Sequence, residues 1–319
     1  MTKLSNIMLV YVSAAIVVFL ILLRFYLRSC VKKCTCKSKL FGKTVIITGA
    51  NSGIGYHTAL RLAGRGARTI LACRDEERAL AAVEKIKNET GNMQVIYRHL
   101  DLTSLQSVRD FANDVLKTED RLDVLVNNAG ACALRNEYTK DGIVEGMQVN
   151  HFGPFLLTLL LIPLLKNSRP SRIVNVSTLM YVFGFVNLEK FNEKRLNRIN
   201  LYADSKLYNL LIQQEFSERL KETDITINSL HPGVIVTGIL GIPNPLFAAF
   251  FKFICWVSPR TAEEGAETAV HLAVSEECKN VTGKFYIDCK ETFLLPKAKD
   301  AVMATKVWSL SEKMVKNYL

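Results

Sequence analysis

The chain contains 319 residues, of which 49% are apolar, which is enough for one α/β domain of about 250 to 280 residues with a large core. Its net charge of +11 is unevenly placed, because residues 1–43 hold eight Lys or Arg and no acid, leaving 33 basic and 30 acidic residues elsewhere. The basic excess belongs to the N-terminus rather than to a nucleic-acid-binding face, so no nucleic-acid partner is predicted.

The first element in the chain is an uncharged apolar segment, residues 4–23. About 20 such residues in a helix span the hydrocarbon core of a bilayer. A cleaved signal peptide would have a shorter apolar region, basic residues before it and a small-residue cleavage site, whereas here the basic residues follow. We therefore expect a transmembrane anchor helix and basic juxtamembrane linker over residues 1–40, followed by a catalytic domain over residues 41–319.

The charges around this segment predict its orientation. Six positive charges, from Arg24 to Lys39, follow it, against Lys3 and the amino terminus before it. The positive-inside rule places the folded domain in the cytosol, and the basic residues favour anionic lipid headgroups. Glycosylation of the sequons at Asn88 or Asn280 would contradict this topology.

Eight cysteines are present, three of them clustered at Cys30, Cys34 and Cys36, with others such as Cys73 and Cys132 in apolar contexts. They show no C-x-x-C spacing and no Cys/His metal pattern, so the sequence predicts no metal site and favours reduced thiols over a disulfide framework. The three clustered cysteines lie within palmitoylation range of the membrane, although ordinary juxtamembrane cysteines fit equally well.

Apolar runs alternate with helical patterns along the rest of the chain. The runs typical of buried strands are residues 44–48, 68–73, 94–100, 123–127, 172–177, 225–230 and 284–287. The main helical patterns are residues 54–66, 104–118, 143–166, 203–221 and 261–275. This alternation predicts an α/β fold, a Rossmann-like doubly wound parallel sheet of about seven strands with helices on both faces.

A glycine-rich turn, T-G-A-N-S-G-I-G, follows the first strand and opens a helix. Gly49, Gly53 and Gly55 allow a tight turn and a close approach of backbone N–H groups to a pyrophosphate at the helix N-terminus. The turn therefore predicts a dinucleotide site, although its G-x-x-x-G-x-G spacing differs from the commoner G-x-G-x-x-G.

The end of the second strand bears on which nucleotide binds. NAD sites place an acid there to hold the ribose 2′-hydroxyl, whereas here Cys73 is followed by Arg74. A guanidinium suits a 2′-phosphate, so NADP(H) is the predicted cofactor. Two alternatives remain: Arg74 is a solvated surface residue, or Asp75 serves as the ribose acid after a slip of one or two residues.

Two further stretches fit the same site. Asp101 ends the third strand, where its carboxylate could accept from an adenine amino group, and Asn127 begins N-N-A-G at the end of the fourth. Open α/β sheets bind ligands at these carboxyl ends, though each residue alone is as easily a loop cap or turn.

Tyr202 and Lys206 lie four residues apart and would share one face of a helix. An adjacent cation favours the phenolate, so we expect Lys206 to lower the pKa of Tyr202. Upstream, an apolar strand ends in Ser177 and Thr178, where a hydroxyl could hydrogen-bond a substrate oxygen.

These motifs occur in the order typical of the short-chain dehydrogenase/reductase superfamily, which residues 41–290 resemble. Within it the chain is similar to the microsomal retinol dehydrogenases, through the N-terminal anchor and the stretches A-C-R-D (72–75), V-N-H-F-G-P-F-L-L-T (149–158) and G-K-F-Y-I-D-C-K (283–290).

The resemblance implies residue roles. Tyr202 would exchange a proton with the substrate oxygen, Lys206 would tune it and hold the nicotinamide ribose, and Asn150 would support a proton relay through water. Contacts to the cofactor are implied for Gly49, Ser52, Gly53, Ile54, Gly55, Arg74, Asp101, Asn127, Lys206, Pro232 and Gly233. One departure is that Thr178 replaces the family's catalytic serine, with Ser177 as the alternative if the register slips. Its extra methyl restricts χ1 and takes pocket volume, so we expect reduced or narrowed activity.

Residues 246–257 are apolar except Lys252 and follow Pro243 and Pro245, where this family carries its substrate loop. Twelve residues are too few to span a membrane. They predict either a helix in the bilayer interface, which would admit a lipid-soluble substrate, or a buried core or oligomer helix.

The expected function is hydride transfer between NADP(H) and a hydrophobic alcohol or aldehyde, retinoid-like or another isoprenoid or lipid aldehyde. The family also implies the endoplasmic reticulum membrane, and a homodimer is left open. A hydroxysteroid dehydrogenase is an alternative within enzymes. A weakly active nucleotide-binding scaffold is another, supported by Thr178 and opposed by intact Tyr202, Lys206 and Asn150.

Overall fold

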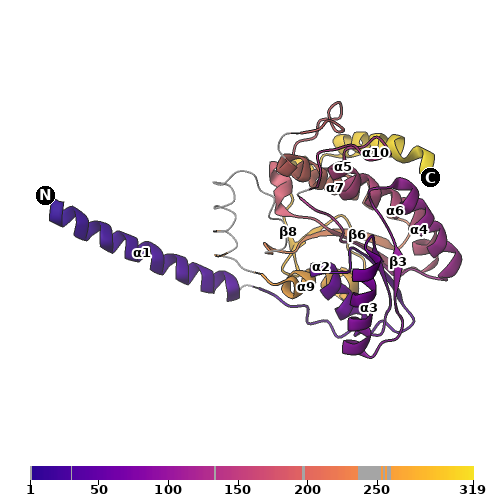
Figure 1. Ribbon diagram of the computed structural model, residues 1–319, viewed down its shortest axis with the longest axis horizontal. Coiled ribbons are helices and arrows are strands. Elements are labelled where there is room, and N and C mark those ends of the chain that lie inside the picture. The colour runs from indigo at the N-terminus through magenta and orange to yellow at the C-terminus, as the bar shows by residue number, and fades with distance from the viewer. Residues whose placement is uncertain are drawn as a thin grey trace.

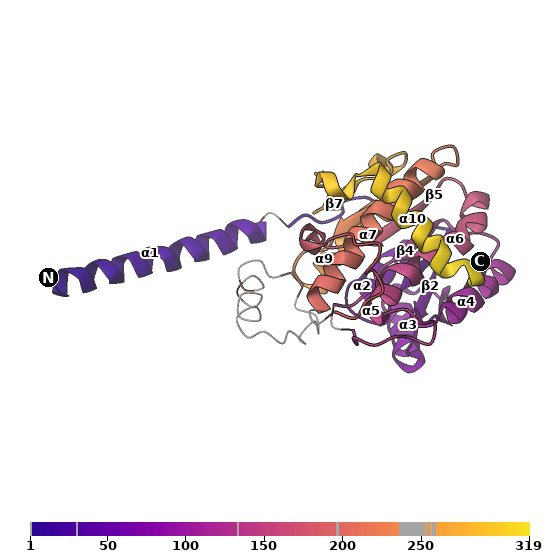
Figure 2. The same ribbon diagram turned by 90° about the horizontal axis from the view of Figure 1, so that it is seen from above.

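A long N-terminal helix projects from an α/β body in two perpendicular views of the computed structural model (Figures 1 and 2). The structure describes residues 2–29, 31–132, 134–195, 198–235, 253, 256 and 260–319. Predictions for the apolar stretch 246–257 thus fall outside the described residues, apart from Phe253 and Trp256.

One sheet of eight strands forms the centre, in the order β3-β2-β1-β4-β5-β6-β7-β8. Seven strands are parallel, as predicted: β1 (Thr44–Thr48), β2 (Arg68–Cys73), β3 (Val95–His99), β4 (Val124–Asn127), β5 (Ser171–Val176), β6 (Ile225–His231) and β7 (Phe285–Ile287). The sequence did not predict β8 (Lys290–Thr292), an antiparallel edge strand. Its three polar residues carry no apolar run, and the turn from β7 places Asp288 and Cys289 at positive φ, 53° and 59°.

Helices cover both faces of the sheet, as predicted (Figure 1). One core cluster joins the sheet to α2 (Gly53–Ala63), α3 (Glu76–Thr90) and α9 (Ala262–Val274). The other joins it to α4 (Leu105–Thr118), α6 (Gly153–Asn167), α7 (Arg198–Arg219) and α10 (Ala301–Val315). Because side chains alternate along a strand, Ile46 belongs to the second cluster, whereas Val45 and Ile47 belong to the first.

The helix predicted over residues 143–166 is continuous but not uniform. It comprises α5 (Glu145–Met147), a π-helical turn η1 (Gln148–Phe152) and α6. Glu145–Asn167 is long and apolar enough to cross a membrane, but 72% of its apolar window is buried. It is therefore a core helix, and single π turns within helices are often found at functional sites.

The N-terminal segment forms α1 (Thr2–Ser29), so its predicted helical structure is confirmed. Large apolar side chains on α1 are exposed, among them Ile16, Phe19, Leu22 and Phe25. At its C-terminal end, Arg28 Nη1 lies 2.6 Å from Glu264 Oε2 at the start of α9. The residues after α1 then run along the α/β body as an extended linker.

Two buried histidines predict acid sensitivity. Burial lowers the pKa of His151 and of His231 to about 4 each. The unfolded chain takes up protons on these side chains near pH 6.5 and the folded chain does not until about pH 4, so stability present above pH 6.5 is lost as the pH falls through this window. We expect each buried histidine to lower the free energy of unfolding by up to about 3 kcal/mol as the pH falls through this window.

Urea unfolding at pH 7.0 and 4.5 measures this loss. His151→Gln should flatten the pH dependence, whereas replacement of His99, which is exposed, should leave the wild-type dependence unchanged. Equal pH dependence in wild type and His151→Gln would refute the assignment of this loss to His151.

Candidate active site

A cleft of about 730 Å³ opens at the carboxyl ends of the parallel strands, within the range of ligand pockets. It is lined by most of the predicted site residues: Gly49, Ser52, Gly53, Ile54, Gly55, Arg74, Asp101, Thr178, Tyr202, Lys206, Pro232 and Gly233. Asn127 and Asn150 do not line it. The position agrees with the rule that open α/β sheets bind ligands beyond their strand ends.

The glycine turn leaves no space for a side chain at Gly55. A Cβ on Gly55 would lie 2.4 Å from Gly49 O and 2.5 Å from Asn128 Nδ2. Gly49 and Gly53 have φ of 63° and 58°, a region that favours glycine. Ser52 is the N-cap of α2 and makes no side-chain capping bond, so the first turn of α2 faces the cleft with donors to spare. A phosphate group fits these donors.

Asn128 is a site residue to which the sequence assigned no role. Its Nδ2 donates to Thr48 O at 2.7 Å and to Gly49 O at 3.2 Å, and the residue lines the cleft. It thereby fixes the glycine turn against the end of β4. In the sequence, only the two adjacent asparagines of N-N-A-G pointed to this contact.

Two guanidinium groups stand at the end of β2. Arg74 is 65% exposed along its side chain, with Nη1 4.0 Å from Asp101 Oδ1, and Arg78 lines the same part of the cleft. The Asp75 carboxylate instead accepts from Arg78 N at 3.0 Å as the N-cap of α3. Its engagement as a cap disfavours the alternative in which Asp75 holds a ribose, and the two arginines fit a 2′-phosphate.

Asp101 lines the cleft, whereas Asn127 does not. Asp101 Oδ1 accepts from Thr103 N at 2.9 Å and lines the cleft. The Asn127 side chain donates to Thr158 Oγ1 and Asn175 Oδ1, each at 3.0 Å, on the α6 side of the sheet. Strand alternation turns it away from the cleft, so its prediction as a side-chain contact to the cofactor finds no support in the geometry.

Tyr202 and Lys206 lie on α7, as predicted, with Lys206 Nζ 5.5 Å from the Tyr202 ring centroid. The ammonium donates to Val176 O, at the end of β5, at 3.0 Å. Burial lowers the pKa of Lys206 to about 8. Burial, helped by the Cys132 thiol, raises the pKa of Tyr202. The expectation that Lys206 lowers the tyrosine pKa is therefore wrong here, because desolvation of the phenolate dominates.

Two hydroxyls meet the cleft beyond β5. Thr178 Oγ1 accepts from Met180 N at 3.3 Å, which leaves its own proton free to donate. Ser177 is 4% exposed, its Oγ has no partner among the described residues, and it borders both the cleft and a small cavity behind it. Thr178 is the more open of the two.

We expect Thr178→Ala to lower kcat/KM about 10²-fold, because it removes a donor to the substrate oxygen. Thr178→Ser should keep or raise activity, since it restores the hydroxyl without the methyl group. Steady-state rates for these variants and for Ser177→Ala, the matched control, test the assignment. A larger loss in Ser177→Ala than in Thr178→Ala would assign the role to Ser177 instead.

Asn150 lies in the π turn and acts behind the cleft. Its Oδ1 accepts from Ala131 N and its Nδ2 donates to Ala131 O, both at 2.9 Å, which clamps the loop after β4. Its main-chain O accepts from Asn209 Nδ2 at 2.7 Å. Asn150, Asn209 and Lys206 border a cavity of about 30 Å³, room for about one water molecule. The sequence did not single out Asn209.

Residues 43–242 match the family model described as short chain dehydrogenase. With its parallel sheet and its strand-end cleft, the chain belongs to the short-chain dehydrogenase family and is an oxidoreductase.

Two relatives and two solved structures are similar to the chain over most of its length. The chain is 44% identical to human retinol dehydrogenase 14 over 293 residues, covering 86% of this chain and 87% of the relative. It is 42% identical to human retinol dehydrogenase 13, covering 88% and 87%. Among solved structures, an uncharacterized protein from Mycobacterium paratuberculosis has a TM-score of 0.70 and 33% identity, covering 88% of this chain and 95% of that one. A short chain dehydrogenase from Burkholderia cenocepacia in complex with NADP has a TM-score of 0.63 and 25% identity, covering 78% and 96%.

Proposed function

We propose that this protein is a membrane-anchored, NADP(H)-dependent oxidoreductase that interconverts a hydrophobic alcohol and its aldehyde, of the retinoid or a related isoprenoid or lipid class. The observation that carries the proposal is one cleft with two arginines at one end and Tyr202, Lys206 and Thr178 at the other. The names of the retinol dehydrogenase relatives support the substrate class.

The cofactor end of the cleft favours NADP(H) over NAD(H). Arg74 and Arg78 offer guanidinium donors to a 2′-phosphate, and the Asp75 carboxylate is held as a helix cap. The first turn of α2 would hold the pyrophosphate. When bound, NADP(H) supplies or accepts the hydride. The Burkholderia neighbour, which holds NADP, supports the same choice.

The chain itself would handle the proton. Burial keeps the Tyr202 phenol protonated, so it can donate to a carbonyl oxygen during reduction. The Thr178 hydroxyl would hydrogen-bond the same oxygen, and Lys206 would place a positive charge beside it. The small cavity next to Lys206 and Asn150 would hold a water that returns the proton to Tyr202 through Lys206.

The substrate end is apolar enough for a lipid-like molecule. Leu134, Val149 and Ile235 line the cleft together with the catalytic side chains. Ile235 is the last described residue before the predicted substrate loop. A hydrophobic aldehyde would bury its chain against these side chains and present its carbonyl to Tyr202.

We also propose that α1 anchors the protein in the endoplasmic reticulum membrane with the α/β body in the cytosol. The exposed apolar side chains of α1 support this, since a soluble helix would turn them into a core. The basic residues between Arg24 and Lys39 support the cytosolic orientation.

Initial rates of the full chain in detergent test the function. NADPH and NADH should each be paired with all-trans-retinal, farnesal, a long-chain aldehyde and a ketosteroid. We expect NADPH-dependent reduction of the aldehydes, with retinal or farnesal preferred. Preference for the ketosteroid would favour a hydroxysteroid dehydrogenase. Tight NADPH binding without turnover would favour the nucleotide-binding scaffold, the alternative that Thr178 supports.

A further inference from the structure

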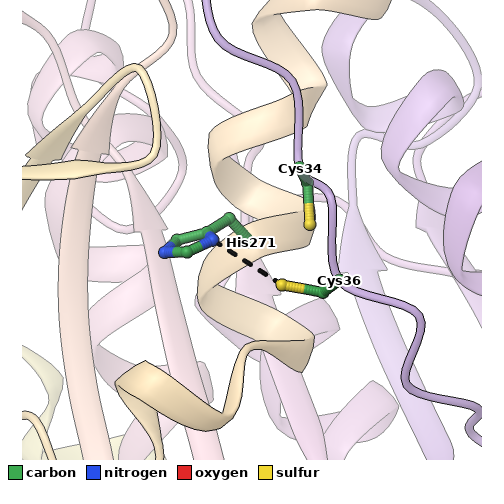
Figure 3. A group of neighbouring side chains, drawn as sticks. All are labelled: Cys34, Cys36 and His271. Carbon is green, nitrogen blue, oxygen red and sulfur yellow. Dashed lines mark hydrogen bonds between the residues drawn. The ribbon is translucent and has the colours of Figure 1, made fainter.

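The linker after α1 brings two cysteines to a buried histidine of α9 (Figure 3). The ligand atoms of Cys34, Cys36 and His271 all lie within 4.8 Å of one another. Cys36 Sγ lies 3.9 Å from His271 Nδ1. Cys34 and His271 are 7% and 6% exposed, whereas Cys36 is half-buried, which gives solvent a path to the group. None of the three lines the catalytic cleft.

Main-chain contacts hold the linker in this place. Cys34 N donates to Glu267 Oε2 at 2.8 Å, and Glu267 is paired with Arg61 at 3.2 Å. Farther along, Leu40 N donates to Arg65 O at 2.8 Å. Glu267 and His271 are four residues apart and share one face of α9, so the bond that seats Cys34 also sets it beside the imidazole.

The other ring nitrogen of His271, Nε2, contacts Cys278, so Nδ1 is the nitrogen available to bind a metal. His271 Nε2 lies 3.5 Å from Cys278 Sγ, and the Cys278 thiol donates to Tyr286 Oη at 3.8 Å. With the Cys278 thiol donating to Tyr286, an N–H at His271 Nε2 would donate to Cys278 Sγ, and the Nδ1 lone pair would then point at Cys36. Metal-binding histidines use the same arrangement, in which the second ring nitrogen donates to a neighbour.

We propose that Cys34, Cys36 and His271 bind one Zn²⁺ ion through Sγ, Sγ and Nδ1, with water in the fourth position. Tetrahedral zinc, with bonds of about 2.3 Å to sulfur and 2.0 to 2.1 Å to nitrogen, needs ligand atoms about 3.5 to 3.8 Å apart. The present separations exceed this by about 1 Å or less, within reach of small side-chain rotations. Binding releases two thiol protons, one from each cysteine, and the site is neutral with the ion in place.

Both thiols must lose their protons to bind the ion, so the affinity for Zn²⁺ should rise with pH. The site departs from the sequence-based prediction of no metal, and it is independent of the proposed catalytic function.

The metal would fasten the membrane linker to the α/β body. The cysteines belong to the segment that follows α1, while His271 belongs to α9, which packs on α2 beside the cofactor turn. A bound ion would therefore fix where the chain leaves the domain for the membrane. Acylation of Cys34 would require this segment to detach, because the thiol is buried.

Cobalt substitution tests the site in the full chain. After chelation under reducing conditions, Co²⁺ should bind at about one equivalent and give the visible and near-ultraviolet bands of tetrahedral thiolate coordination, and Zn²⁺ should abolish them. Cys36→Ser should lose the bands, and Cys132→Ser, which removes a thiol outside the cluster, should keep them. No bands in wild type, or equal bands in Cys36→Ser, would overturn the proposal.

Proteolysis gives a second readout that needs no colour. Trypsin cleavage after Lys37, the residue next to Cys36, should slow at least about tenfold when Zn²⁺ binds and should not change in Cys36→Ser. Cys36 is half-buried, so serine there should preserve the fold, which circular dichroism can verify. Equal protection by Zn²⁺ in both proteins, or a Cys34–Cys36 disulfide in protein kept under argon, would refute the site.

Discussion

Tyr202→Phe should lower kcat by about 10²- to 10⁴-fold, the contribution typical of a positioned proton donor. The substitution removes the one phenol that lines the cleft beside Lys206 and Thr178 among the described residues. It removes no contact to the arginine end, so the dissociation constant for NADPH should change less than about threefold. Rates with saturating aldehyde, together with NADPH binding by fluorescence, measure both effects.

Tyr208 provides a matched control on the same helix. Its hydroxyl donates to Asn187 O at 3.1 Å, and the residue does not line the cleft. Tyr208→Phe should lower stability by about 1 kcal/mol and leave kcat within a few-fold. Retention of more than a tenth of wild-type turnover in Tyr202→Phe would remove Tyr202 from the chemistry.

The pH dependence of reduction should follow Lys206. Burial sets its pKa to about 8, so the ammonium is lost as the pH rises through this value. Burial also holds the Tyr202 phenol in its protonated form over the same range. The rate of aldehyde reduction should therefore fall above about pH 8. A rate that rises steadily to pH 10 would contradict this assignment.

Arg74→Ala should raise the KM for NADPH about 10- to 100-fold and leave the KM for NADH nearly unchanged. A charge-assisted hydrogen bond to a phosphate contributes about 1.5 to 3 kcal/mol, and NADH lacks that phosphate. Arg78→Ala should show a smaller loss with the same selectivity. Steady-state kinetics with both nucleotides measure the ratio.

Two controls make this result specific. Arg169→Ala removes an exposed arginine outside the cleft lining and should change neither KM. Asp75→Ala should also leave the KM for NADH unchanged, because the carboxylate caps α3. Equal effects of Arg74→Ala on the KM for NADPH and the KM for NADH, or a large effect of Asp75→Ala on the KM for NADH alone, would show that Asp75 holds the ribose as its acid.

Local patterns in the sequence predicted the parts of the structure that depend on neighbours along the chain. Thr44–Thr48 is a mostly apolar run that is buried along its whole length. Such runs are typical of parallel strands that helices cover on both faces of the sheet. The glycine turn was recognised from three glycines between a strand and a helix. The Tyr202–Lys206 pair was recognised from its spacing, because four residues make about one helical turn. These features placed the cleft and most of its lining.

Features that depend on tertiary packing were not predicted. The direction of the Tyr202 pKa shift depends on how deeply α7 is buried, and the orientation of Asn127 depends on which face of β4 it occupies. Cys36 and His271 are separated by 235 residues, so their approach is visible only after the linker and α9 are placed. The edge strand β8 carries too little apolar pattern to be recognised.

The decisive measurement is transfer of deuterium to all-trans-retinal from NADPH that carries deuterium at both C4 positions, in a single turnover of the full chain. We predict retinol that carries one deuterium on its alcohol carbon, formed by wild type and at least about 100-fold more slowly by Tyr202→Phe. Firm binding of NADPH with no labelled retinol, and none from farnesal or a long-chain aldehyde, would contradict the proposed oxidoreductase function.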